Sequence, residues 1–251
     1  MTWRPRPWPD LRLRVRAADY GYAVRHEARA LLGRRTDPGR YLGSSAGTPV
    51  LLLPGIFETW RFLEPLAAHL AAAGHPVHVL SSLGINRRPV LDGAERAQTY
   101  LEENDLTGVV LVAHSKGGLI GKTLMLADAG AGAGAGAGAR VAGMVAVATP
   151  WEGSVYARLF PPGSAVRHFS PRNAQILTLA RERAINARIV AVAPAWDPHI
   201  PGTGALPGAR RTVRLAGSGH FRVLDDADLV EAVVTAVAEL GADGPVEPVG
   251  P

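Results

Sequence analysis

The sequence contains no cysteine and only two lysines, and these scarcities exclude several kinds of protein. Without cysteine the chain has no disulfide, no zinc–thiolate centre and no thiol nucleophile. Lys116 and Lys122 are the only lysines, so the formal charge of +5 comes almost wholly from arginine. No uninterrupted apolar run approaches the roughly 18 to 20 residues of a membrane span. The basic N-terminal stretch lacks the apolar core of a secretion signal. We therefore expect a cytoplasmic protein without stable membrane insertion.

The bulk composition is that of an ordinary globular protein. Apolar residues make up 47% of the chain and charged residues 20%, which is not typical of a disordered chain. The most basic stretch, 4–16, alternates leucine or valine with arginine, which predicts a half-buried edge strand protected by its charges. An arm that binds nucleic acid or an anionic membrane is the alternative. No aromatic-and-basic pattern supports base stacking, so we expect no nucleic-acid partner.

Apolar runs and helical patterns alternate along the chain, which predicts an α/β fold. Short apolar runs followed by amphipathic segments are typical of parallel strands joined by right-handed helical crossovers. We expect a mostly parallel sheet of about six or more strands with helices on both faces. The expected strands are 50–53, 77–81, 109–112, 141–147, 189–192 and 212–215. The expected helices are 19–32 with Asp19 as its N-cap, 60–73, 91–103, 116–129, 173–184 and 225–240.

Three further segments bear on the domain organisation. We expect one domain over 1–251, because the alternating glycine–alanine tract 130–138 is typical of a flexible surface connection and the α/β rhythm resumes directly after it. Residues 241–251 are expected to be a disordered tail. Residues 151–188 separate two expected strands by more than one crossover needs, so they form either a small cap or lid or an ordinary extension of the core.

The pattern Ala113-His-Ser-Lys-Gly117 predicts a nucleophilic serine. It lies between a buried apolar strand and a helix, which is the context of the nucleophile elbow, a tight turn that holds the serine hydroxyl above the sheet. Small residues two before and two after Ser115 are needed because the backbones of strand and helix nearly touch there. A serine hydroxyl is a weak nucleophile until an adjacent base removes its proton, so the motif requires partners elsewhere in the chain.

His220 and Asp197 are the expected base and acid. His220 lies in a loop of small residues after the last expected strand, from which its imidazole can reach Ser115. Asp197 follows the preceding strand, and its carboxylate would orient the imidazole and stabilise its charged form. A simple turn before the following proline is the alternative role for Asp197. Asp225 and Asp226 are rival acids that better fit the start of the last helix.

Two backbone amides are expected to stabilise the oxyanion of a tetrahedral intermediate. One is the N–H of Lys116, at the start of the helix after the elbow. The other is the N–H of Ile56, because Gly55 allows the chain to turn after the strand 50–53. Gly55 as a plain turn residue is compatible with this role.

These motifs resemble the α/β-hydrolase superfamily, and within it bacterial lipases and carboxylesterases. The resemblance runs from about Val50 to Leu240. It is carried by Leu53-Pro-Gly-Ile-Phe57, similar to the oxyanion loop, by Ala113-His-Ser-Lys-Gly-Gly118, similar to the lipase elbow, and by Val147-Ala-Thr-Pro-Trp-Glu-Gly-Ser154, similar to the segment after the next strand. It implies an α/β-hydrolase fold with a small cap. The site residues that it implies are Ser115, Asp197 and His220 for catalysis, Ile56 and Lys116 for the oxyanion, and Phe57 and Trp151 for substrate contact.

The sequence departs from the usual family pattern at three positions. Ala113 stands where most members have glycine, and alanine occurs there in one branch of bacterial lipases. Pro54 replaces the histidine that commonly precedes the oxyanion glycine, which leaves the N–H donor intact. Lys116 replaces the more frequent methionine or glutamine and puts a cation next to the serine in the sequence.

The resemblance implies a serine hydrolase that cleaves a small-molecule or lipid ester through an acyl-enzyme, with no metal and no organic cofactor. The same three side chains also support acyl transfer and thioester or amide hydrolysis, because a fold does not fix a function. A non-catalytic binding protein with the same fold is an alternative from another class. The motifs do not encode the oligomeric state or the physiological ester.

Overall fold

A six-stranded parallel sheet forms the centre of the computed structural model, which describes residues 9–32, 36–43, 47–135, 139–200, 202 and 204–243. The strand order is β2-β1-β3-β4-β5-β6, and every neighbouring pair is parallel. The strands are β1 (Val50–Leu53), β2 (Val77–Val79), β3 (Val109–His114), β4 (Val141–Val147), β5 (Ile189–Ala193) and β6 (Arg211–Arg214). Each expected strand is present within two residues of its predicted ends, so the predicted fold class is confirmed.

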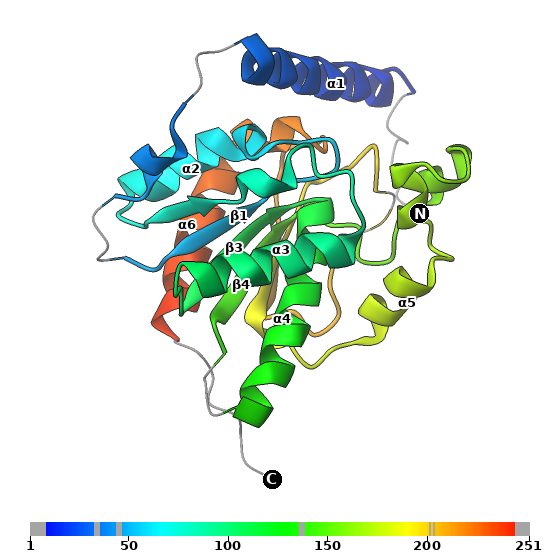
Figure 1. Ribbon diagram of the computed structural model, residues 1–251. Helices are drawn as coiled ribbons and strands as arrows, with labels where there is room; N and C mark the ends of the chain where they lie inside the picture. The colour runs from blue at the N-terminus through cyan, green and yellow to red at the C-terminus, as the bar shows by residue number, and fades with distance from the viewer. Residues whose placement is uncertain are drawn as a thin grey trace, which may run out of the picture.

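Helices cover both faces of this sheet (Figure 1). Successive side chains of a strand point to opposite faces. Val50 and Leu52 of β1 accordingly enter a core with α2 and α6, whereas Leu51 and Leu53 enter a core with α3 and α4. The long helices of these layers are α2 (Glu64–Ala72), α3 (Val90–Glu103), α4 (Lys116–Ala135) and α6 (Ala227–Ala242). All four residues of β1 are fully buried, as expected for a parallel sheet covered on both sides.

Short helices occupy most of the connections. The expected helix 60–73 begins with a 3-10 turn, so it is η2 followed by α2, whereas the expected helix 225–240 is α6, which starts at Ala227 after η7. The segment 151–188 consists mainly of short helices. These elements are η1 (Pro38–Tyr41), η2 (Trp60–Leu63), η3 (Ser81–Leu83), η4 (Val155–Leu159), η5 (Ala165–Phe169), α5 (Ala174–Arg181), η6 (Asn186–Arg188) and η7 (Arg222–Asp225). Asp226 is the N-cap of α6, and its side chain accepts a hydrogen bond from the N–H of Asp228 at 3.0 Å.

The N-terminal segment is a helix, and the prediction of an edge strand over 4–16 is wrong for its described part. Helix α1 spans Pro9–Leu32, and Figure 1 shows it lying outside the layers formed by the sheet and its helices. Leu13 is 64% exposed, so the alternation does not place this side chain on a buried face. Arginine, alanine and leucine all favour a helix, and this propensity over the whole segment outweighs a short alternation. Asp19 is a buried residue in the middle of the helix, where the sequence predicted an N-cap.

The glycine–alanine tract begins as helix, which corrects the prediction of a flexible connection. Helix α4 continues to Ala135 because its alanines favour the helix that its glycines weaken. Residues 136–138 lie outside the described residues. Helix α6 ends at Ala242, so the predicted tail over 241–251 starts too early, and residues 244–251 also lie outside the described residues.

Within the part of the chain that the structure describes, no helix combines the length and apolar character needed to cross a membrane.

Candidate active site

Ser115 occupies a one-residue turn between a strand and a helix. Strand β3 ends at His114 and helix α4 begins at Lys116. Ser115 has a φ of 50°, in the left-handed region that a non-glycine residue adopts only where the surrounding structure holds it. Its N–H donates a hydrogen bond to the carbonyl oxygen of Val147 at 2.8 Å. This strained strand-to-helix turn is the geometry that the elbow motif predicts.

Close packing explains the two glycines that follow the serine. A Cβ atom on Gly117 would lie 2.0 Å from the carbonyl oxygen of Leu53, and one on Gly118 would lie 2.0 Å from Oγ1 of Thr149. No side chain fits at such distances. The first turn of α4 can therefore pass the ends of β1 and β4 only if these two positions are glycine.

The structure brings Ser115, His220 and Asp197 into one hydrogen-bonded line. Nε2 of His220 lies 3.0 Å from Oγ of Ser115, and Nδ1 of His220 lies 2.7 Å from Oδ2 of Asp197. The three residues follow β3, β6 and β5, so the carboxyl ends of three parallel strands bring them to one edge of the sheet. Ser115 and His220 are both buried. The arrangement supplies a hydroxyl, a base within hydrogen-bond reach and a carboxylate that orients the base.

Asp197 is fixed on both of its oxygens. Oδ1 accepts hydrogen bonds from the N–H groups of His199 at 2.7 Å and Ile200 at 3.0 Å, while Oδ2 faces His220. Burial raises the pKa of Asp197, but the charge and hydrogen bond of His220 and the two amides outweigh it and hold the pKa below its ordinary value. The turn predicted before Pro198 and the contact with the imidazole are therefore made by the same carboxylate.

Asp19 of helix α1 supports the same loop from another side. Its Oδ1 accepts hydrogen bonds from the N–H groups of Phe221 at 2.8 Å and Arg222 at 3.0 Å, and its Oδ2 lies 3.6 Å from Nε2 of His199. Burial raises the pKa of this fully buried carboxyl, but these contacts lower it further than burial raises it. Nothing local in the sequence relates Asp19 to a loop about 200 residues away, so this role could not be predicted.

The two expected oxyanion donors are backbone amides near Ser115. Ile56 lines the same cavity as Ser115, and Lys116 follows the serine at the first position of α4. Among the described residues, neither the N–H of Ile56 nor that of Lys116 donates a hydrogen bond to another backbone group. Both amides are therefore free of the backbone pairing that would compete with a ligand oxygen.

The ammonium group of Lys116 is held by oxygen atoms of the loop after η3. Its Nζ donates hydrogen bonds to the carbonyl and side-chain oxygens of Asn86, at 2.7 and 3.0 Å, and to the carbonyl oxygen of Arg88. Asn86 in turn donates to the carbonyl oxygen of Pro54 at 2.7 Å. Burial lowers the pKa of Lys116 to about 8. The side chain thus ties α4 to the loop after η3 and to the residue before Gly55, and it does not line the cavity beside Ser115.

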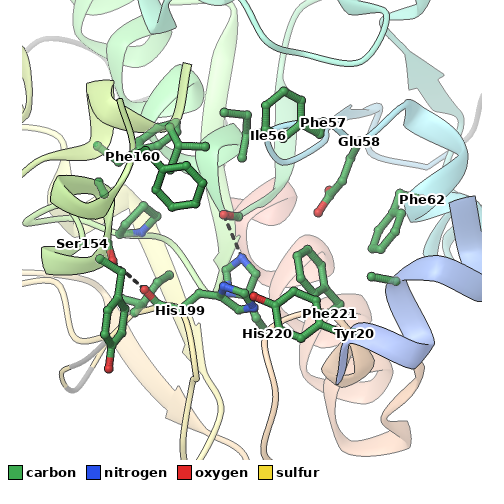
Figure 2. Close-up of a pocket in the computed structure, with 18 of the residues that line it drawn as sticks. Tyr20, Ile56, Phe57, Glu58, Phe62, Ser154, Phe160, His199, His220 and Phe221 are labelled. Atoms are coloured by element: carbon green, nitrogen blue, oxygen red, sulfur yellow. Dashed lines mark hydrogen bonds between the residues drawn. The ribbon is translucent and has the colours of Figure 1, made fainter. Parts of the chain in front are cut away.

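A cavity of about 380 Å³ opens beside Ser115. Figure 2 shows His220 in its wall, with Phe160 and Ser154 to one side and Glu58 and Phe62 to the other. The lining comes from six parts of the chain: Tyr20, Ala23 and Glu27 of α1; Ile56, Phe57, Glu58 and Phe62; Ser115; Pro150, Ser154, Tyr156, Ala157, Phe160, Val166 and Phe169; His199 and Ile200; and His220 and Phe221. Most of this lining is apolar, and no lysine or arginine of the described residues belongs to it.

The two predicted substrate contacts have different positions. Phe57 lines the cavity and is 47% exposed. Trp151 does not line it, because its side chain is buried in the core with α4, and Nζ of Lys122 lies 5.8 Å from its ring centre. Tyr156 and Phe160 of the same segment line the cavity in its place. The sequence pointed to this aromatic segment but could not show which of its rings face the serine.

Two buried polar residues beside the serine also escaped the sequence analysis. Glu58 follows the loop that contains Ile56, and His114 lies inside the elbow motif itself. Each is an ionisable residue that directly follows apolar residues of the sequence, which is the signal that could have identified it.

The chain has the α/β-hydrolase fold. Among solved structures it is similar to lipase B of Aspergillus fumigatus, with a TM-score of 0.62 and 17% identity over 82% of this chain and 55% of the lipase. It is also similar to the monoacylglycerol lipase of Paleococcus ferrophilus, with a TM-score of 0.57 and 16% identity over 77% of this chain and 96% of that one. The bromoperoxidase of Bacillus anthracis has a TM-score of 0.51 and 16% identity over 78% of this chain and 92% of its own.

Comparison of the sequence with protein-family models and with curated proteins gives no match. At these identities the structural similarity defines the fold, and the chemistry has to be argued from the site itself.

Proposed function

We propose that the protein is a serine hydrolase that cleaves carboxylic esters through an acyl-enzyme. The observation that carries this proposal is the line from Oγ of Ser115 through His220 to Asp197, with distances of 3.0 and 2.7 Å, at the wall of an apolar cavity. In the first step Oγ attacks the ester carbonyl carbon while Nε2 of His220 takes its proton and passes it to the leaving alcohol. In the second step His220 activates a water molecule, which releases the acid and restores Ser115.

The amides of Ile56 and Lys116 are the proposed oxyanion donors. Each tetrahedral intermediate places a negative charge on the former carbonyl oxygen, which needs preorganised donors. Lys116 is the first residue of α4, where the helix dipole also favours negative charge. Ile56 faces the same cavity from the loop after β1.

The cavity favours uncharged esters of short to medium length. Its volume of about 380 Å³ is at the lower end of the range of roughly 300 to 1,000 Å³ that is typical of small-molecule sites. Among the described residues that line it, the only carboxylates are Glu27 and Glu58 and there is no lysine or arginine, so an anionic substrate would find no cationic partner. Residues 151–188 form the proposed cap, because Ser154, Tyr156 and Phe160 from this segment make one wall.

A fluorophosphonate probe and a series of chromogenic esters test the proposal. We expect the probe to modify Ser115 and the wild-type protein to hydrolyse the shorter esters, whereas a folded Ser115→Ala variant does neither. An added alcohol that yields a new ester faster than acid forms would assign the site to acyl transfer. Folded wild-type protein that neither reacts with the probe nor hydrolyses any ester would overturn the proposal in favour of a binding function.

A further inference from the structure

Glu58 and His114 form a buried pair next to the line formed by Ser115 and His220. Both carboxylate oxygens of Glu58 lie 2.9 Å from Nδ1 of His114. His114 is fully buried and Glu58 is 2% exposed. The proposed ester hydrolysis assigns no step to either side chain, although His114 directly precedes the nucleophile.

The two ends of this pair contact different halves of the site. Oε2 of Glu58 accepts a hydrogen bond from the N–H of Gly55 at 2.6 Å, and Gly55 precedes the proposed oxyanion donor Ile56. At the other end, Nε2 of His114 lies 3.0 Å from the backbone carbonyl oxygen of His220. A carbonyl oxygen only accepts hydrogen bonds, so Nε2 of His114 carries a hydrogen and donates it.

The surroundings of His114 favour its doubly protonated form. Because Nε2–H donates to a carbonyl, a second hydrogen on Nδ1 is what completes the contact with the Glu58 carboxylate. Burial lowers the pKa of His114, but the charge and hydrogen bond of Glu58 and the carbonyl of His220 outweigh burial and raise it. Further hydrogen bonds help a buried ion pair to be tolerated: the N–H of Gly55 donates to Oε2 of Glu58, and the carbonyl oxygen of His220 accepts from Nε2 of His114. Oε1 of Glu58 has its contact with Nδ1 of His114.

Gly55 is also required by this contact. A Cβ atom at position 55 would lie 2.7 Å from Oε1 of Glu58, so only glycine allows the carboxylate to approach the backbone of the loop. Gly55, which the sequence predicts as a turn residue, is therefore also the residue whose backbone binds the Glu58 carboxylate.

We propose that Glu58 and His114 are positioning residues that hold the oxyanion loop and the base of the proposed hydrolase in fixed relation. The connection runs from the N–H of Gly55 through Glu58 and His114 to the carbonyl of His220. It spans two loops that are far apart in the sequence and that must both contact one reacting carbonyl group. A displacement of about 1 Å between such groups costs on the order of 100-fold in rate, which sets the scale of the effect. The inference rests on the ester hydrolase proposed above.

Three conservative variants test the separate contacts of the Glu58–His114 pair. Glu58→Gln keeps the shape of the side chain and an acceptor for Gly55 but removes the charge. His114→Gln can keep a donor near the Nε2 position, which faces His220, and His114→Asn can keep one near the Nδ1 position, which faces Glu58. We expect each to lower kcat by about 10- to 100-fold while KM changes by less than about threefold, because Glu58→Gln keeps the shape of its side chain in the cavity wall and His114 does not line the cavity.

Rates are expressed per serine titrated with a fluorophosphonate, so that unfolded protein does not count as slow protein. Asp128→Asn is the matched control, because Asp128 is also a buried carboxylate that accepts two amides, those of Arg140 at 2.9 Å and Val141 at 3.0 Å, and it does not line the cavity. We expect this control to lose stability and keep its kcat per titrated site. If the Glu58 and His114 variants also keep wild-type kcat per titrated site, the positioning role is overturned. Wild-type protein without a titratable serine would instead overturn the proposed function.

Proton NMR gives a second, spectroscopic test. We expect a low-field signal from the Nδ1–H of His114 that Asp197→Asn retains and Glu58→Gln abolishes. If no such signal exists in the wild-type protein, the assignment of Glu58 and His114 as a charged pair is wrong.

Discussion

The carboxylate of Asp19 in helix α1 accepts a hydrogen bond at 2.8 Å from the N–H of Phe221, which lies 202 residues further along the chain. This contact joins the N-terminal helix to the loop that carries His220. Tyr20 and Glu27 of the same helix line the cavity beside Ser115. Helix α1 lies outside the layers of the fold (Figure 1), yet it contributes one wall of the candidate site.

Replacement of Asp19 tests whether α1 supports the site. We expect Asp19→Ala to lower the free energy of unfolding, because the two partly buried amides of Phe221 and Arg222 lose their acceptor at a cost of about 0.5 to 1.5 kcal/mol each. Ester turnover should fall by up to about 100-fold as the His220 loop shifts. Asp19→Asn keeps an acceptor oxygen for both amides and should have a smaller effect on each quantity. Urea denaturation and kcat measure the two effects, and an Asp19→Ala protein with wild-type values for both would show that this contact does not support the site.

The three side chains of the hydrogen-bonded line should act as one unit. We expect Ser115→Ala and His220→Ala each to reduce kcat by roughly 10⁶-fold, and the double variant to be no slower than either single variant. Asp197→Asn should cost on the order of 10⁴-fold, because the amide favours the wrong tautomer of the imidazole. Steady-state kinetics on one chromogenic ester provides the measurement. Independent, multiplicative losses in the double variant would contradict a shared mechanism.

The glycines of α4 should divide into two groups when each is replaced by alanine. Gly117→Ala should destabilise the fold severely, since the new Cβ atom would lie 2.0 Å from the carbonyl oxygen of Leu53. Gly130 lies on the same helix with no atom within 4 Å of such a Cβ. Gly130→Ala should therefore stabilise the protein by roughly 0.5 to 1 kcal/mol through helix propensity. Thermal denaturation of both variants checks the contrast, and a stabilising Gly117→Ala would refute the close approach of α4 to β1.

The buried Lys122 predicts a stability that rises with pH in the mildly alkaline range. Burial lowers the pKa of Lys122 to about 8 from its usual 10.5. Between these two values the unfolded chain binds more protons than the folded one, so the free energy of unfolding increases as pH rises through this window. The full effect of one such lysine is on the order of 3 kcal/mol.

Lys122→Met isolates this contribution. The variant keeps a long side chain against Trp151 and cannot be protonated, so its stability should rise less between about pH 8 and pH 10 than that of the wild-type protein. Lys116 and the buried tyrosines titrate in both proteins and cancel in the difference. Chemical denaturation across the pH series gives the two curves, and parallel curves would show that Lys122 titrates normally in the folded state.

The sequence by itself determined the sheet, most of its helices and the turn that carries Ser115. These features depend on local patterns: continuous apolar runs for strands buried on both faces, amphipathic spacing for helices, and small residues on both sides of a serine. The strand ends could be predicted within two residues for this reason. The order of Ser115, Asp197 and His220 along the chain also follows from the placement of loops at the carboxyl ends of successive strands.

Only the tertiary structure decided which side chains meet. Alternating leucines predicted a strand where α1 forms, because a short local alternation does not show whether a buried surface exists for it to cover. Asp19 reaches the His220 loop, and Glu58 reaches His114, across separations of 202 and 56 residues respectively. Local periodicity carries no information about such pairs, because they arise from how the loops fold over the sheet edge. The sequence could therefore indicate a serine, a base and an acid, whereas the structure revealed the buried residues that hold them in place.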